Sequence, residues 1–170
     1  MSVTKEYDEL IKASAAQWIP EWSWLYLKAQ WYAESLLDIN AVSPVGAEGP
    51  CQFMPETWSD VKSKLRYPFN ASPKDPQYAF NAGAYYMAVM RSGWSAKRSE
   101  EDRAKLARSS YNAGFGNLLE AQKLSGGKPD YASIIAKLPE VTGVVNAKQT
   151  TDYVVRIERY YQQFKAEEAT

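Results

Sequence analysis

Helical periodicity runs through almost the whole of this 170-residue chain. Apolar residues recur three or four positions apart in most segments, and no stretch keeps the two-residue alternation of a half-buried strand. Over residues 3–18, for example, Tyr7, Leu10, Ile11 and Trp18 fall on one stripe. The pattern predicts an all-α fold.

Start and stop residues divide this pattern into helices. Pro20 is expected to open a helix that ends near Leu36 or Leu37, because proline is tolerated in a first turn. Ser99, with Asp102 three residues later, is an expected N-cap. The predicted helices cover residues 3–18, 20–37, 55–65, 75–90, 99–113, 118–124, 131–138 and 151–167.

The length favours one domain. A chain of 170 residues can bury roughly 70% of the surface that its unfolded form exposes, and neither an internal repeat nor a linker divides it. We expect a single domain over residues 1–170, with a helix over residues 3–18 and a core over about 18–164. The expected oligomeric state is a monomer.

Composition removes several kinds of catalysis. The sequence contains no histidine, which excludes a Ser-His-Asp triad, a Cys-His pair and a histidine zinc site. Cys51 is the single cysteine and has no histidine to generate its thiolate, so it is a weak candidate nucleophile. Acid and base chemistry therefore falls to carboxylates, and neither a metal nor a cofactor is expected.

Charge gives little sign of a polyanionic partner. Twenty basic and twenty acidic side chains cancel, so no global field gathers nucleic acid or an anionic membrane. No apolar run reaches the length of a membrane span, and the charged first ten residues do not resemble a secretory signal. We expect no nucleic acid and no membrane insertion. The basic residues Lys62, Lys64, Arg66 and Lys74 are interpreted as a solvated face.

A candidate acid stands just before a glycine-bearing loop. Glu34 lies at the end of the second predicted helix, and residues 40–55 then change to the Ser, Pro, Gly and Ala of an ordered loop. A carboxyl delivers a proton to a glycosidic oxygen near neutral pH when burial raises its pKa. By itself, however, a helix-end glutamate is usually solvated. Asp38 and Glu48 are the weak candidates for the second carboxylate that most glycosidases use.

Three motifs follow one another along the chain. The first combines Glu34-Ser35 with SPVGAEG at residues 43–49 and QFMP at residues 52–55. The second is SYNAG at residues 110–114, and the third is TTDYV at residues 150–154. Together they resemble the motifs of the soluble lytic transglycosylase family. The resemblance covers about residues 18–164 and implies a lysozyme-like fold of the goose type.

The resemblance also implies a reaction. One glutamate protonates the oxygen that bridges N-acetylmuramic acid (MurNAc) and N-acetylglucosamine (GlcNAc), and then takes the proton of the C6 hydroxyl of the same MurNAc. The attack of that hydroxyl closes a 1,6-anhydro ring without water. The implied partner is the peptidoglycan glycan strand, and no cofactor takes part.

The family's site residues carry over to matching positions here. Glu34 is the implied catalytic acid and base, and Tyr111 the residue that orients it. Ser43 is expected to bond near the acid or the N-acetyl group, Gln52 and Met54 to line sugar subsites, and Asn112 to shape the site. Phe53, Tyr153 and Gln149 are further expected lining residues, while Gly46, Gly49 and Gly114 are interpreted as backbone devices.

Some positions depart from the family, and two other functions stay open. Pro50 and Cys51 replace two apolar residues, Gln149 replaces a glutamate and Ala79 an asparagine. A hydrolytic lysozyme (muramidase) of the same fold, or a non-catalytic wall-binding or virion component, would share much of the sequence. The apparent lack of a signal peptide suggests a phage product, virion-associated or an endolysin, that acts in the periplasm or cell wall.

Overall fold

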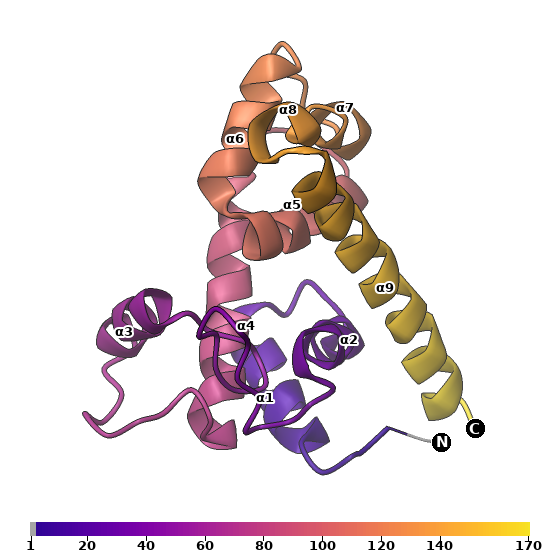
Figure 1. Cartoon of the computed structure of the whole chain (residues 1–170). Coiled ribbons are helices and arrows are strands. Elements are labelled where there is room, and N and C mark those ends of the chain that lie inside the picture. Colours follow the sequence, from indigo (N-terminus) through magenta and orange to yellow (C-terminus); the bar gives the residue numbers. More distant parts are fainter. Residues whose placement is uncertain (1–2) are drawn as a thin grey trace. The chain divides into compact units, whose positions relative to one another are not determined.

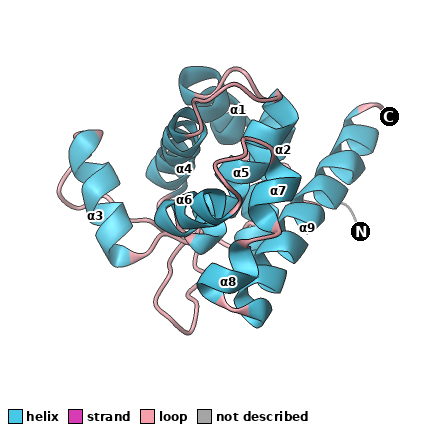
Figure 2. Ribbon diagram, turned by 90° about the horizontal axis from the view of Figure 1, so that it is seen from above, coloured by secondary structure: helices cyan, strands magenta, loops and turns pink. Residues whose placement is uncertain are grey.

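The computed structural model describes residues 3–170 of the chain, which form nine α-helices joined by turns and loops (Figures 1 and 2). Among these residues the only strand-like pairing consists of isolated bridges from Glu48 to Val42 and to Phe53. The all-α prediction is confirmed. The helices are α1 (Asp8–Trp18), α2 (Trp24–Ser35), α3 (Pro55–Lys64), α4 (Pro76–Gly93), α5 (Glu100–Ala113), α6 (Phe115–Leu124), α7 (Tyr131–Ile135), α8 (Leu138–Thr142) and α9 (Val144–Glu168).

Helices with a strong start signal begin where the sequence predicts. Pro55 opens α3 directly after its N-cap, Met54. At α5 the Ser99 hydroxyl accepts a hydrogen bond from the Asp102 amide at 3.1 Å. A cap that satisfies a free N–H of the first turn fixes the start of a helix more firmly than apolar periodicity does.

Two predicted starts near the N-terminus are wrong. α1 begins at Asp8 and not at residue 3. Pro20 does not open α2, because Ser23 is the N-cap and its hydroxyl accepts from the Leu25 amide at 3.3 Å. Pro20 lies instead in the turn that precedes α2, two residues before the buried Trp22.

The predicted helix over residues 131–138 is two helices, α7 and α8. Pro139 does not stop a helix there, because it occupies the first turn of α8, where a missing N–H costs nothing. Gly143, with φ 88°, then ends α8 and leads straight into α9. α9 therefore begins at residue 144, well before the predicted start at residue 151. α6 also begins earlier than predicted, and α4 ends later.

The chain forms two compact units, each described by itself. The first contains the described residues up to Tyr86 together with Ile157–Thr170, and the second contains Met87–Arg156. α4 and α9 each contribute to both units. The expected single domain over residues 1–170 stays a prediction. Across the described residues, no helix has the length and apolar content needed to cross a bilayer.

The first unit is built on aromatic contacts around α2. α1 packs on α2, and the last turns of α9 stack Tyr161 on Tyr26 with ring centroids 3.6 Å apart. On α4, a Cβ at Gly83 would lie 2.7 Å from the Trp31 ring. The Trp31 ring can come this close to α4 because glycine has no side chain. A buried ion pair joins α2 to α1, with Lys28 Nζ 2.7 Å from an Asp8 oxygen.

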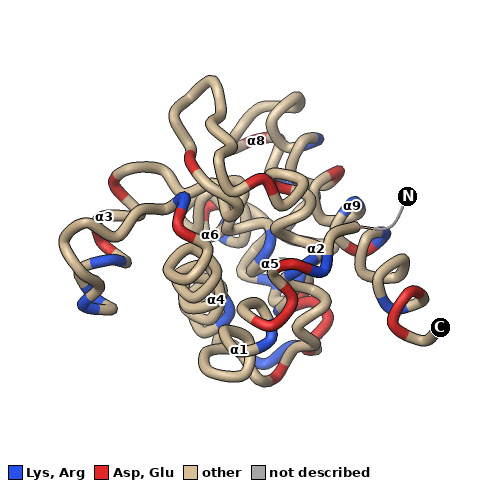
Figure 3. Tube along the Cα trace, turned by 90° about the horizontal axis from the view of Figure 1, so that it is seen from below, with Lys and Arg blue, Asp and Glu red and all other residues tan. Residues whose placement is uncertain are grey.

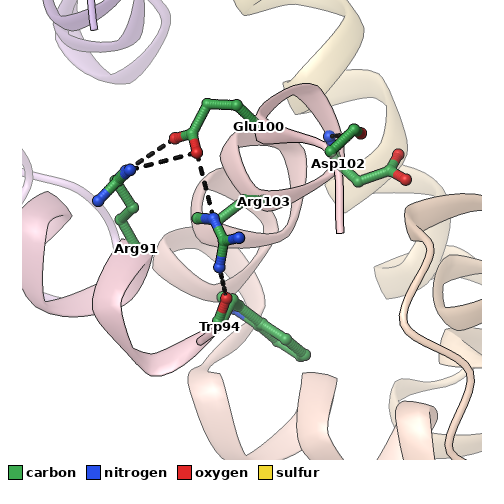
Figure 4. A network of polar contacts seen from close by, with 6 residues as sticks. Arg91, Trp94, Glu100, Asp102 and Arg103 are labelled. Atoms are coloured by element: carbon green, nitrogen blue, oxygen red, sulfur yellow. Dashed lines mark hydrogen bonds and ion pairs between the residues drawn. The ribbon is translucent and has the colours of Figure 1, made fainter. Parts of the chain in front are cut away.

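The second unit packs α5 on α6 and α7, and α6 on α8. A polar network holds the start of α5 (Figure 4). Glu100 pairs with Arg91 at 2.7 Å and with Arg103 at 3.2 Å, and Arg103 also donates to the carbonyl of Trp94. The buried Trp94 indole donates to the Ser110 hydroxyl at 2.9 Å. These contacts fix α5, whose last turn carries Tyr111 and Asn112.

Candidate active site

Glu34 lies in the last turn of α2 and is partly buried. The chain then leaves the helix through two consecutive leucines in the left-handed region, Leu36 at φ 57° and Leu37 at φ 61°. A residue with a Cβ pays about 1–2 kcal/mol in this conformation. Backbone strain of this kind is typical of functional sites, and here it directly follows the candidate acid.

Ser35 joins the end of α2 to the loop that follows. Its Oγ lies 2.8 Å from the Pro50 carbonyl oxygen and 3.1 Å from the Trp31 carbonyl oxygen. The first contact spans from the helix to the far side of the loop, and the second stays within α2. Because Glu34 is the preceding residue, this hydroxyl helps to fix the backbone from which the carboxylate projects.

The loop satisfies much of its own backbone. The amide of Ser43 donates to the Ala47 carbonyl at 2.9 Å, and the Ser43 hydroxyl accepts from the Ala47 amide at 3.0 Å. At Gly49, φ is 79° and a Cβ would lie 1.8 Å from the Pro73 carbonyl oxygen, so only glycine fits. Ser43 and Gly49 therefore help to hold the loop in its conformation.

Gln52 has a structural role within the loop. Its own φ of 53° is left-handed. Its side-chain Nε2 donates to the Gly49 carbonyl at 2.8 Å and lies 3.3 Å from the Ala41 carbonyl oxygen. The Ala41 contact joins the two arms of the loop, and the Gly49 contact closes the local turn, so Gln52 braces the segment that is expected to line sugar subsites.

The two residues after Gln52 differ in exposure. Met54 is 42% exposed, which makes it available to a ligand. Phe53 is only 2% exposed and packs edge-on against Trp58, with ring centroids 5.4 Å apart. Phe53 therefore belongs to the core, and its burial argues against the predicted place in a cleft wall.

Cys51 marks a dry region close to Glu34. The thiol is fully buried, and a Cβ at Gly83 would lie 2.8 Å from its sulfur. Burial raises the pKa of the Cys51 thiol well above its usual range, and the negative charge of Glu34 raises it further. A thiol that stays protonated is a poor nucleophile, so the structure argues against Cys51 as a catalytic group.

The second unit gathers two of the predicted residues in one pocket. Asn112, in the last turn of α5, and Gln149, on α9, both line a pocket of about 250 Å³. Tyr111 is partly buried and Tyr153 is almost fully buried, and neither lines the pocket. The other lining residues are Ala113, Asn117, Thr142, Asn146 and Thr150.

Amides and hydroxyls dominate this pocket, and no charged side chain lines it. The Thr150 hydroxyl donates to Asn112 Oδ1 at 2.8 Å. Asn117 and Asn146 each use Nδ2 to donate to a helix-end carbonyl, of Ala113 at 2.7 Å and of Thr142 at 3.0 Å. Such a lining suits a neutral ligand that offers amides or hydroxyls. Sequence reasoning missed Asn117 and Asn146, because they come from separate helices and from no motif.

The predicted site residues thus fall into two sets. Glu34, Ser43, Gln52 and Met54 belong to the first unit, and the set from residue 111 onward belongs to the second. The predicted orientation of Glu34 by Tyr111 stays a prediction.

Two solved structures show which class of protein has this fold. The 70 kDa soluble lytic transglycosylase of Escherichia coli matches 96% of this chain with a TM-score of 0.74, at 24% identity and over 25% of its own length. An inactive mutant of the lytic transglycosylase Slt of Pseudomonas aeruginosa also matches 96% of this chain, with a TM-score of 0.73, at 20% identity and over 25% of its own length. The fold is thus the lysozyme-like fold of a lytic transglycosylase domain.

The chain belongs to the transglycosylase SLT domain family, whose model matches residues 10–134. That match includes Glu34 and Asn112 but ends before Gln149. Relatives named membrane-bound lytic murein transglycosylase F occur in Alteromonas mediterranea, at 30% identity over 81% of this chain, and in Photobacterium profundum, at 29% over 84%. The matched part is 31% and 29% of those relatives, so the chain spans about a third of their length. The predicted family is confirmed.

Proposed function

We propose that this chain is a peptidoglycan lytic transglycosylase that cleaves the β-1,4 bond between MurNAc and GlcNAc. The observation that carries the proposal is the position of Glu34, partly buried in the last turn of α2 and directly before a serine whose hydroxyl binds the loop. Membership of the transglycosylase SLT domain family and relatives named for murein transglycosylation support the same activity.

In the proposed reaction Glu34 acts first as an acid and then as a base. Its proton goes to the bridging oxygen as the glycosidic bond breaks, and the GlcNAc hydroxyl leaves. The resulting carboxylate takes the proton of the C6 hydroxyl of MurNAc, whose oxygen attacks C1 and closes the 1,6-anhydro ring. The first step needs the protonated carboxyl and the second needs the carboxylate, so one group that exchanges a proton near the working pH can perform both.

This reaction needs no second catalytic carboxylate. Of the two weak candidates, Asp38 is exposed and its Oδ1 accepts from the Asn40 amide at 2.9 Å, as in a surface turn. Glu48 lies in the loop, where its backbone pairs with Phe53. The substrate's own hydroxyl replaces the nucleophile that a retaining glycosidase supplies.

The remaining predicted residues receive binding and positioning roles. Met54 offers exposed apolar surface to a sugar face, while Ser43 and Gln52 keep the loop in shape. The amide pocket at Asn112 and Gln149 has donors and acceptors for an N-acetyl group or for the peptide stem of peptidoglycan. The proposed partner is therefore the glycan strand of the cell wall. The expected monomer and phage source stay predictions.

Product analysis tests the proposed function. Purified sacculi are digested with the chain, and the soluble fragments are weighed by mass spectrometry. Fragments with anhydro ends, lighter by the mass of one water than reducing ends, are the expected result. Reducing ends would instead identify a muramidase. No soluble fragment, together with retained binding to sacculi, would identify a non-catalytic wall-binding or virion component.

A further inference from the structure

The neutral net charge hides a local imbalance. Residues 61–74 contain four basic side chains and no acidic one. They form the end of α3 and the connector that leads to α4. We use the name α3 arm for α3 together with residues 65–75. Within the first unit, α3 lies to one side of α1 and α2 in both views (Figures 1 and 2), and Lys and Arg gather towards one end of the arm (Figure 3).

The arm is an ordered structure. The Trp58 indole donates to the Ala71 carbonyl at 3.3 Å, and the Tyr67 hydroxyl lies 2.6 Å from Asn81 Oδ1 on α4. Arg66, in the left-handed region at φ 54°, turns the chain back after α3. These contacts fix the two sides of the connector. The backbone therefore holds the residues between them, at the tip of the arm, in one position at the surface.

Phe69 stands at this tip and is 95% exposed. A turn closed by the Ala71 amide and the Pro68 carbonyl at 2.9 Å carries it. Lys62 Nζ donates to the Phe69 carbonyl at 2.9 Å and lies 5.3 Å from the centroid of the ring. An apolar ring and a cation are thus presented together to the outside.

We propose that the α3 arm binds the surface of an anionic lipid bilayer. Phe69 enters the interfacial layer, while Lys62, Lys64 and Arg66 contact lipid phosphates. Exposed aromatic and basic residues are the combination that interfacial binding uses. Anionic lipid headgroups complement the charge of the basic residues. The boundary between headgroups and acyl chains removes the Phe69 ring from water. A soluble polyanion would complement only the charge and would leave Phe69 exposed.

The acidic residues of the arm define its binding end. Glu56 and Asp60 lie earlier in α3, and Asp75 is the last residue of the arm, directly before α4. Residues 61–74, which lie between them, carry no acidic side chain. The proposed contact with the bilayer is therefore peripheral and limited to this segment. None of the tip residues belongs to the candidate active site, and the proposal does not depend on the proposed function.

Vesicle sedimentation tests the proposal. The full chain is mixed with vesicles of phosphatidylcholine alone or of phosphatidylcholine and phosphatidylglycerol. We expect binding to the anionic vesicles only, weakened by salt. Phe69→Ser should lower the partition coefficient about tenfold or more, since it removes a ring that gains from burial. Lys64→Gln should lower it about fivefold, as expected for one cation near an anionic surface.

Matched controls remove the same kinds of side chain elsewhere. Val155→Ser changes a residue that is 68% exposed, and Lys123→Gln changes an exposed lysine of α6, and both should bind vesicles as the parent chain does. Digestion of lipid-free sacculi should be unchanged by Phe69→Ser. Equal binding to neutral and anionic vesicles, or no effect of Phe69→Ser, would overturn the proposal. So would binding to soluble polyphosphate without binding to anionic vesicles.

Discussion

The two helices that carry the predicted catalytic motifs end in different ways. α2 passes from Ser35 into two left-handed leucines, Leu36 and Leu37, whereas α5 passes from Ala113 into Gly114, at φ 93°. Leucine resists a positive φ, and glycine does not. The end beside Glu34 is therefore strained, and the end beside Asn112 is relaxed.

The difference shows where tertiary contacts are needed. Ser35 holds the strained end to Pro50 at 2.8 Å, and the side chain of Leu37 is 4% exposed. At α5, an ordinary helix-end bond from the Gly114 amide to the Ser110 carbonyl, at 2.9 Å, is enough. Strain thus accompanies the proposed acid and not the amide pocket.

The largest expected effect tests which end performs the chemistry. Glu34→Gln keeps the shape of the side chain and removes its acid, so turnover of sacculi should fall about 1,000-fold or more. The melting temperature should change little. Glu56→Gln, at an exposed position of α3, is the matched control and should keep full activity. Near-parental turnover by Glu34→Gln would remove Glu34 from the mechanism.

A pair of glycines compares the stability of the two ends. In Gly49→Ala the new Cβ would meet the Pro73 carbonyl oxygen at 1.8 Å, and we expect a loss of about 3 kcal/mol or more in the free energy of unfolding. In Gly114→Ala the nearest atom is 3.7 Å away, so only the backbone conformation, at φ 93° and ψ 134°, resists, at about 2 kcal/mol. Urea denaturation measures both. Equal losses would contradict the packing argument at Gly49.

A variant that removes only the hydroxyl of Tyr111 tests the predicted role of this residue. If Tyr111 orients the acid, Tyr111→Phe should lower the rate of sacculus clearance about five- to tenfold, the effect of one lost hydrogen bond of about 1–1.5 kcal/mol. Tyr160→Phe, on α9, is the control for a general effect of removing a tyrosine hydroxyl. An unchanged rate would take Tyr111 out of the site.

The smallest effect concerns the strain itself. Leu36 is 65% exposed, so Leu36→Gly relieves the backbone and loses little packing. The greater freedom of glycine in the unfolded chain offsets part of that gain, and we expect about 0.5 kcal/mol of net stabilisation by urea denaturation. Leu37→Gly also relieves a left-handed residue, but it removes a buried side chain and should destabilise by about 2 kcal/mol. Destabilisation by both would show that Leu36 is not strained.

The sequence predicts helices well where a side chain or a proline marks the start. Ser99 and Pro55 mark α5 and α3 correctly, because their effect is local. Pro20 misleads, since the capping hydroxyl of Ser23 competes with it and sets the start of α2. Pro139 misleads for another reason: a proline that ends one helix and a proline that opens the next look alike in sequence.

The candidate site was predictable only in part. The position of Glu34 at a helix end and the need for glycine at residue 49 follow from the motif. The left-handed conformation of Leu36 and Leu37 does not, because those residues rarely adopt it and tertiary contacts impose it. Asn117 and Asn146 reach the amide pocket from different helices, and spacing along the chain gives no sign of such convergence.

The inaccessible sulfur of Cys51 provides a chemical probe for opening of the loop. Cys51, in the loop, is the sole thiol and is fully buried next to Gly83, so it can react with an alkylating reagent only in molecules whose loop has opened. The rate of alkylation would therefore report how often the loop opens. Measured with and without a glycan fragment, the alkylation rate of Cys51 would tell whether the substrate slows the opening of the loop that follows Glu34.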